Sequence, residues 1–222
     1  MQHYLKSPPH KLTGGKIPFT RFPAVDGSTL SDQTCDRMIS MWSISKHHQQ
    51  SKMGCFLSHL NLHKQIAKQK LNGVLIIEDD ADLRNVQIPS EIDNLDGLCF
   101  FGGWATSLKV KDNKLPLDFH PNHKHGGKRL TLNRINRDRY RILQTRAYFV
   151  PNWKISRDLV DFIEGHKRVR AIDLMIDKFP KTDYFLFPAA ATNRVGSQST
   201  RDKKTKNQDQ LLYYIEDDQP IS

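Results

Sequence analysis

Three consecutive acidic residues, Glu78-Asp79-Asp80, directly follow a short hydrophobic run, and they are the residues of this chain best suited to chemistry. Carboxylates this close together repel one another and resist desolvation, so they are costly at the end of a buried strand unless a positive charge compensates. Mg²⁺ or Mn²⁺ supplies such a charge, because hard cations prefer oxygen ligands and complete their coordination with water and phosphate oxygens. The acids therefore predict a site for a divalent ion and a phosphate-bearing ligand.

The spacing of the acids suggests how they would share an ion. Successive side chains of a strand point to opposite faces, so Glu78 and Asp80 would lie on one side and Asp79 on the other. Ligands of open α/β sheets gather outside the carboxyl ends of strands, where these acids fall. The alternative is a helix N-terminus or loop with solvated acids. A second triplet, Glu216-Asp217-Asp218, lies near the C-terminus and is interpreted as the acidic end of a terminal helix.

The elements that must position the acids follow from the hydrophobic periodicity. Apolar residues at three- and four-residue steps predict an amphipathic helix over 51–70, ended by Asn72-Gly73, and the run 74–77 predicts a strand buried on both faces. Strands alternating with helices predict a single α/β domain over 1–222 with a mostly parallel sheet, an irregular basic insertion at 105–145 and a tail at 200–222. The other predicted elements are strands at 98–101, 146–150 and 184–187, helices at 153–165 and 171–179, and an edge strand or loop at 18–25.

The composition narrows the class of partner. A formal net charge of +10 favours anions, whether nucleic acid, an anionic membrane surface with which the protein associates peripherally, or a diphosphate. The basic stretches lack interleaved aromatic residues, so no specific nucleic acid is expected. Three widely spaced cysteines fit neither a disulfide framework nor a zinc site. With no apolar stretch long enough to cross a bilayer, we expect a soluble, cytoplasmic protein.

One combination of motifs resembles a known family. Met53-Gly54-Cys55-Phe56-Leu57-Ser58-His59-Leu60, followed after a helix by a hydrophobic strand that ends in Glu78-Asp79-Asp80, resembles glycosyltransferase family 25. That family includes lipooligosaccharide and collagen galactosyltransferases. The segments 21–27, 147–150 and 171–173 resemble further parts of the family. The resemblance implies a GT-A type (Rossmann-like) fold, a nucleotide-diphosphate sugar as donor, and Mn²⁺ or Mg²⁺ held by the acids.

The resemblance also implies roles near the donor. Asp80 and Glu78 are the predicted ion ligands, with Glu78 or Asp79 contacting the metal-bound water or the ribose of the donor. Ser58 and His59 would either lie near the donor or hold the helix against the acidic strand. A packed, hydrogen-bonded histidine is the ordinary alternative for His59.

Further roles concern the sugar, the acceptor and the leaving group. Gly102-Gly103-Trp104 follows a predicted strand, where absent side chains admit a sugar and an indole covers its apolar face, although a plain tight turn has the same composition. Asp173 would deprotonate the acceptor hydroxyl, or else be an ordinary acid in a first helical turn. Arg194 and Gln198 would close over the leaving diphosphate, or belong to a tail.

Together with the family resemblance, these observations predict transfer of a hexose, of galactose or glucose type, from a nucleotide-sugar to a hydroxyl of a glycan or glycoconjugate; inversion is what the resemblance implies. Two rival readings use the same residues. A metal-dependent nuclease or phosphotransferase would also use the acids and the positive charge. A basic nucleic-acid-binding module without catalysis would use the acids only to cap an element.

Overall fold

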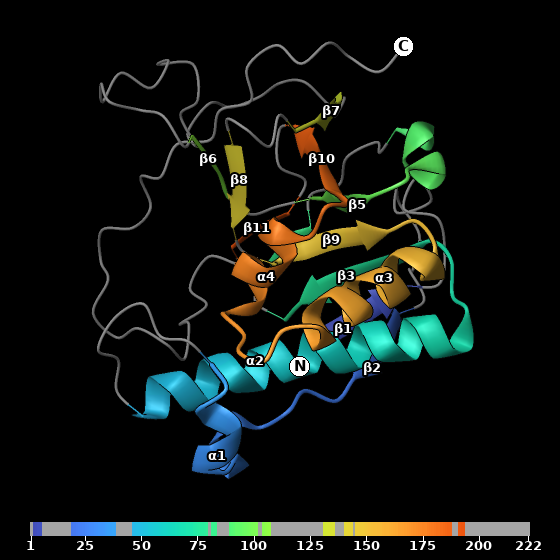
Figure 1. Cartoon of the computed structure of the whole chain (residues 1–222). Coiled ribbons are helices and arrows are strands. Elements are labelled where there is room, and N and C mark those ends of the chain that lie inside the picture. The colour runs from blue at the N-terminus through green and yellow to red at the C-terminus, as the bar shows by residue number, and fades with distance from the viewer. Residues whose placement is uncertain are drawn as a thin grey trace.

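A central sheet with two long helices on one face organises the computed structural model (Figure 1). The described residues are 2–5, 19–38, 46–79, 81–83, 89–101, 104–107, 131–135, 140–143, 145–187 and 191–193.

Seven strands form this sheet, in the order β2-β1-β3-β9-β5-β10-β7. The strands predicted around 74–77, 98–101, 146–150 and 184–187 are all present, and the segment 18–25 supplies β2 at the sheet edge. β3, which ends in the first of the three acids, has a neighbour on each side and is buried along most of its length. The strands are β1 (Gln2–Leu5), β2 (Phe19–Phe22), β3 (Val74–Glu78), β5 (Leu98–Phe100), β7 (Thr131–Arg134), β9 (Ala147–Val150) and β10 (Thr182–Phe187).

The strand directions differ from the prediction of a mostly parallel sheet. Among the described strands of this sheet, β5 and β10 pair in parallel, whereas every other neighbouring pair is antiparallel. β9 lies between β3 and β5 and runs against both. Parallel neighbours need a long crossover, usually a helix, and the described part of the connection from β5 to β9 contains strands and no helix. The parallel prediction is therefore wrong for these strands, and the mixed α/β class is confirmed.

The helices predicted over 51–70, 153–165 and 171–179 are present and form a layer against the sheet, whereas the predicted terminal helix lies outside the described residues. The helix expected over 51–70 begins earlier, at Lys46, and α2 and α3 lie side by side on one face of the sheet (Figure 1). Asn152 caps α3, because its side chain accepts hydrogen bonds from the backbone N–H groups of Lys154 and Ile155. The helices are η2 (Gly27–Thr29), α1 (Asp32–Cys35), α2 (Lys46–Gln69), η3 (Ser90–Asn94), α3 (Trp153–Glu164) and α4 (Ile172–Lys178).

Side chains along β3 and β9 alternate between two hydrophobic cores. Ile76 and its cross-strand partner Tyr148 belong to the core under α2 and α3. Leu75 and its partner Phe149 belong to the core on the opposite face, which η3 helps to cover. Glu78 comes two residues after Ile76 and therefore points to the helical face. The fold thus directs the first acid of the triplet toward α2.

The end of α2 is set by a residue other than the predicted glycine. Lys70 adopts a left-handed conformation with φ 52°. The N–H of Lys70 donates to the carbonyl of Ala67 and the N–H of Leu71 donates to that of Ile66, which is the Schellman pattern. Gly73, also with positive φ (66°), comes three residues later and begins the approach to β3. The helix therefore stops before the Asn-Gly pair.

Two small antiparallel sheets complete the described architecture. β4 (Ala81–Leu83) pairs with β11 (Ala191–Asn193), with Ala81 opposite Asn193. β6 (Trp104–Ser107) pairs with β8 (Tyr140–Leu143). The predicted irregular insertion at 105–145 therefore contains strands where it is described. The first pairing matters more for function, because it brings the chain that follows β10 beside the acidic segment.

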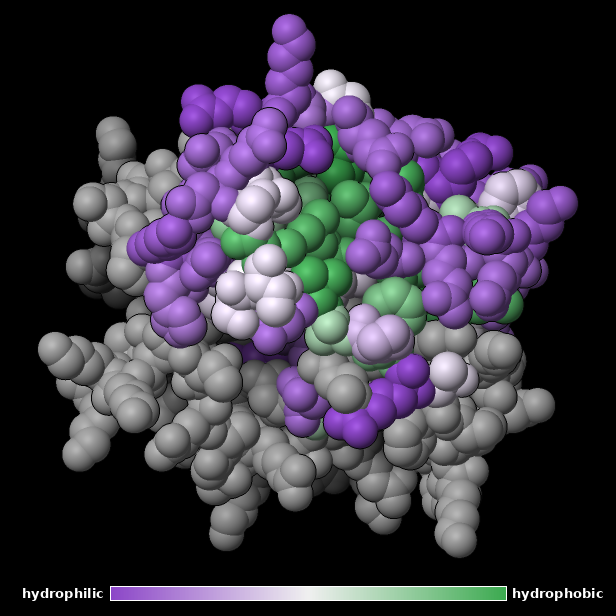
Figure 2. Space-filling model, turned by 90° about the horizontal axis from the view of Figure 1, so that it is seen from below, coloured by the Kyte–Doolittle hydropathy of each residue, from purple (hydrophilic) through white to green (hydrophobic). Residues whose placement is uncertain are grey.

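Figure 2 shows a face on which hydrophilic residues surround a central apolar area. Among the described helices, none is long and apolar enough to cross a membrane. Half-buried hydrophobic side chains pack against the main core: Leu30, Cys55, Leu57, Leu71, Trp153 and Phe162.

Candidate functional site

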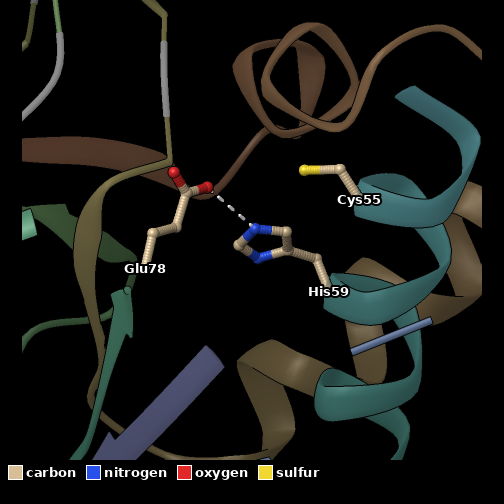
Figure 3. Close-up of side chains that lie close together, drawn as sticks. All are labelled: Cys55, His59 and Glu78. Atoms are coloured by element: carbon tan, nitrogen blue, oxygen red, sulfur yellow. Dashed lines mark hydrogen bonds and ion pairs between the residues drawn. The ribbon is translucent and has the colours of Figure 1, made fainter. Parts of the chain in front are cut away.

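The end of β3 is tied to the middle of α2 by a histidine and an acid. Nε2 of His59 lies 3.2 Å from Oε1 of Glu78 (Figure 3). The hydroxyl of Thr145 donates to the same carboxylate oxygen at 2.6 Å. The His59 side chain has no exposed surface, whereas that of Glu78 is 23% exposed. Glu78 therefore stands at the boundary between the core and the surface, with one oxygen held from inside.

His59 is the outer end of a chain of buried hydrogen bonds. Its Nδ1 lies 2.8 Å from the hydroxyl of Tyr148, and that hydroxyl lies 2.9 Å from Nε2 of His63. Nδ1 of His63 in turn lies 2.8 Å from Oγ of Ser156 on α3. Each of these four side chains is fully buried. Buried polar groups are costly when unpaired, and this chain pairs them from α3 through β9 and α2 to the end of β3.

The two histidines of this chain titrate in opposite directions. Burial alone would lower the pKa of His59, but hydrogen bonding to Cys55 and Glu78 and electrostatic interaction with Glu78 outweigh it and raise that pKa to about 9. Burial, followed by repulsion from His59, lowers the pKa of His63 to about 3. Burial also raises the pKa of Tyr148 well above its usual value, with Glu78 adding to the effect. At neutral pH this describes a charged His59 beside Glu78 and a neutral His63.

Cys55 completes a group of three potential metal ligands. One ligand atom from each of Cys55, His59 and Glu78 lies within 4.8 Å of the other two, and all three side chains point toward one another in Figure 3. A sulfur, an imidazole nitrogen and a carboxylate oxygen suit Zn²⁺ better than Mg²⁺. Within the described residues, this is the group with such a geometry.

The glycine and serine of the motif at 53–60 serve packing. A Cβ on Gly54 would lie 2.8 Å from the backbone nitrogen of Gly27 and 2.9 Å from the carbonyl oxygen of Val25, closer than real contacts allow. Oγ of Ser58 accepts from the N–H of Val25 at 2.8 Å and donates to the carbonyl of Gly54 at 2.7 Å. The motif therefore seats α2 against residues 25–27. Of the two roles predicted for Ser58, these contacts match the holding of a helix, here against a loop.

The remaining predicted residues fall in several places. Asp79 is exposed and directly follows β3. Asp173 lies in the first turn of α4, where its carboxylate accepts from the N–H of Leu174 at 2.9 Å. In the described part of the chain, no hydrogen bond or ion pair joins Asp173 to Glu78 or His59. Trp104 begins β6. The residues that lie outside the described ranges are Asp80, Gly102, Gly103, Arg194 and Gln198.

Cys55, His63 and Tyr148 belong to the site but received no role in the sequence analysis. Cys55, His59 and His63 recur at four-residue steps on α2, a spacing that places side chains on one helical face. That spacing was the available signal. Tyr148 carried no such signal, because its contact with His59 joins residues 89 positions apart.

The acidic segment fits a hard divalent ion, because carboxylate oxygens are the ligands that Mg²⁺ and Mn²⁺ prefer. Oε1 of Glu78, however, already accepts hydrogen bonds from Thr145 and His59. This use differs from the predicted role of Glu78 as a direct ion ligand. Downstream of the acids, Ala81 pairs with Asn193, the residue that precedes Arg194 in the sequence.

Comparisons with known proteins agree with the motifs. Residues 2–176 match the model of glycosyltransferase family 25, described as an LPS biosynthesis protein. A stretch of 66 residues is 39% identical to a protein of Drosophila melanogaster named Glycosyltransferase 25 family member; it covers 27% of this chain and 11% of that relative. No solved structure matches. The family match spans most of the chain, including α2, the acidic segment and the strand that carries Tyr148, and the chain belongs to glycosyltransferase family 25.

Proposed function

We propose that this chain transfers a hexose from a nucleotide-diphosphate sugar to a hydroxyl of a glycan or glycoconjugate, in a metal-dependent reaction that inverts the anomeric centre. The family match supports glycosyl transfer. The observation that supports a donor site is the arrangement at the end of β3, where Glu78 is held by His59 and where Ala81, three residues later, pairs with Asn193. A GT-A type arrangement is part of the proposal.

In this proposal each acid has a separate role at the nucleotide-sugar site. Asp80 holds the ion, and Asp79 contacts its water ligands or the ribose. Glu78 fixes the strand end through His59 and Thr145. Mn²⁺ or Mg²⁺, when bound, supplies positive charge that stabilises the leaving diphosphate.

The segment that follows β11 acts on the leaving group. Asn193 lies opposite Ala81, the residue next to Asp80 in sequence. Arg194 follows Asn193 directly in the sequence and Gln198 comes four residues later, and we assign their guanidinium and amide groups to the diphosphate. Charge-assisted hydrogen bonds from Arg to phosphate oxygens are strong and directional. These residues therefore stabilise the negative charge that develops as the glycosidic bond to the diphosphate breaks.

The remaining residues of the proposal bind the sugar of the donor and act on the acceptor. Gly102 and Gly103 come between β5 and β6 in the sequence, and Trp104 is the first residue of β6; these three residues shape the sugar site. Asp173, half-buried in the first turn of α4, accepts the proton of the acceptor hydroxyl as that oxygen attacks the anomeric carbon.

Thermal-shift measurements with UDP-galactose, UDP-glucose and GDP-mannose, each with and without MnCl2, test the proposal. A donor at about 100 times its dissociation constant stabilises a protein by roughly 2.7 kcal/mol, which for a chain of this size raises Tm by about 5 °C or more. We expect such a rise for at least one donor, and only with Mn²⁺. No rise for any of them would contradict the proposal. Cleavage of DNA or RNA with Mg²⁺ would favour the nuclease reading instead.

A further inference from the structure

The hydroxyl of Tyr148 can form hydrogen bonds to its two histidine neighbours in only a few ways. It carries one proton and lies within hydrogen-bond distance of two imidazole nitrogens, Nδ1 of His59 and Nε2 of His63. It must therefore donate to one ring and accept from the other. This single group couples the tautomer of His63 to the proton on Nδ1 of His59.

Two hydrogen-bond orders satisfy every atom of the chain. In the first, Ser156 donates to His63, His63 to Tyr148, Tyr148 to His59, and His59 to Glu78. In the second, His59 carries both ring protons and donates to Glu78 and to Tyr148, while Tyr148 donates to His63 and His63 to Ser156. His59 donates to Glu78 in both orders, because an ionised carboxylate only accepts. The anchor on Glu78 is thus kept whichever order is present.

This chain of hydrogen bonds also joins three neighbouring elements of the fold. Ser156 lies on α3, His63 and His59 lie one turn apart on α2, and Tyr148 lies on β9 beside β3. The rings of both histidines stack on the ring of Tyr148, with centroids 5.7 and 5.8 Å away. A buried ring with both nitrogens bonded has little freedom to rotate. His59 is therefore held in one orientation toward the acid.

We propose that Tyr148 is a positioning residue of the donor site, which acts through His59 to fix the carboxylate of Glu78 and, with it, the strand end that leads into Asp79 and Asp80. The proposal rests on the proposed function, because the acids position an ion only if one binds there. Its chemical content is preorganisation: the acids reach the ion-binding arrangement before the ion arrives. Residues that orient metal ligands indirectly typically change metal affinity or activity 10- to 100-fold when they are replaced.

The matched variants are Tyr148→Phe and Tyr184→Phe. Both tyrosines are buried residues of the same sheet, and each loses one hydroxyl; that of Tyr184 donates to Asp96 at 2.7 Å, in a hydrogen bond unconnected with the chain at Glu78. The probe is Mn²⁺ alone, titrated into the protein and followed by the EPR signal of the free ion. We expect Tyr148→Phe to weaken Mn²⁺ binding about 10-fold or more and Tyr184→Phe to leave it within about twofold of the wild type.

A second measurement follows the chain of hydrogen bonds from Ser156 to Glu78 directly. Imidazole ¹⁵N NMR, assigned with His59→Gln and His63→Gln, should show ordered, hydrogen-bonded ring nitrogens in the wild type and in Tyr184→Phe, and their loss in Tyr148→Phe. Should Tyr148→Phe fail to fold, Ser156→Ala removes the far end of the chain and should weaken Mn²⁺ binding in the same direction.

The outcomes are separable. A wild-type protein that binds no Mn²⁺ contradicts the proposed function itself. Wild-type binding that Tyr148→Phe leaves unchanged overturns only the positioning role, even if the NMR signals of the histidines change. One equivalent of zinc in the purified protein, lost in Cys55→Ser and kept in Cys35→Ser, would also overturn it, because Nε2 of His59 would then hold a metal instead of Glu78.

Discussion

Nε2 of His59, a fully buried residue of α2, lies 3.2 Å from Oε1 of Glu78, the last residue of β3. This contact joins the two parts of the chain that carry its family motifs. It also places a hydrogen-bond donor and a positive charge behind the acids. Glu78 therefore helps to hold α2 against β3, while part of its side chain stays exposed to solvent.

Replacing His59 should test how much of the fold depends on this contact. His59→Ala leaves Glu78 without its buried partner and opens a gap between α2 and β9, so we expect the free energy of unfolding to fall by about 3 kcal/mol. His47→Ala, an exposed histidine on the same helix, should change it by less than about 0.5 kcal/mol. Urea unfolding measures both. Equal stabilities of the two variants would show that the contact contributes little.

His63 should make the protein sensitive to acid. Its pKa is lowered to about 3 in the folded state, below the value of 6.5 expected when unfolded. The stability gained by keeping it neutral is therefore present above pH 6.5 and lost as pH falls from 6.5 toward 3, by about 1.4 kcal/mol per pH unit. Between pH 7 and 4.5, in EDTA, the wild type should lose about 2 to 3 kcal/mol relative to His63→Gln. Parallel stability curves for the two proteins would refute the buried neutral state.

Gly54 should not tolerate a side chain. Gly54→Ala places a Cβ against the backbone of Gly27 and Val25, and we expect a loss of about 2 kcal/mol, seen as a drop in Tm of roughly 4 to 8 °C. Gly165→Ala is the control, because its Cβ would meet its nearest atom, the carbonyl oxygen of Asp161, at an ordinary 3.4 Å. A Gly54→Ala protein as stable as Gly165→Ala would mean that α2 and residues 25–27 are not in close contact.

Local pattern predicted the elements of this fold but not their arrangement. Apolar spacing identified α2 and β3, and the acids after β3 identified the site, because those signals lie within a few residues. The direction of β9 was mispredicted, since alternating strands and helices say nothing about a strand that enters the sheet without a helical crossover. The end of α2 was predicted to within one residue, but the residue that adopts the left-handed conformation there is Lys70 and not a glycine.

In the site, too, individual residues could be predicted from the sequence, but their contacts could not. His59 and Glu78 were both singled out, yet their contact depends on how α2 packs across β3. The role of Tyr148 depends on the register that sets it opposite Ile76, and neither register nor packing is encoded in a short segment. The four-residue spacing of Cys55, His59 and His63 was present in the sequence, but the sequence analysis drew nothing from it.

Asp173 should separate transfer from donor binding. If its carboxylate accepts the proton of the acceptor hydroxyl, Asp173→Asn should lower the rate of transfer at least about 100-fold. Stabilisation by nucleotide-sugar and Mn²⁺ should stay the same, because this acid takes no part in holding the donor. Asp161→Asn, an exposed acid on α3, should keep full activity. Undiminished transfer by Asp173→Asn would assign the proton to another group.

Mn²⁺-dependent hydrolysis of UDP-galactose, UDP-glucose and GDP-mannose by Asp80→Asn, beside Asp218→Asn in the second acidic triplet, tests the central claim most directly. Both variants lose one carboxylate from an acidic triplet that follows an apolar run. The account predicts that Asp80→Asn loses hydrolysis while its melting temperature without ligand is unchanged, and that Asp218→Asn keeps it. Hydrolysis retained by Asp80→Asn would contradict the account.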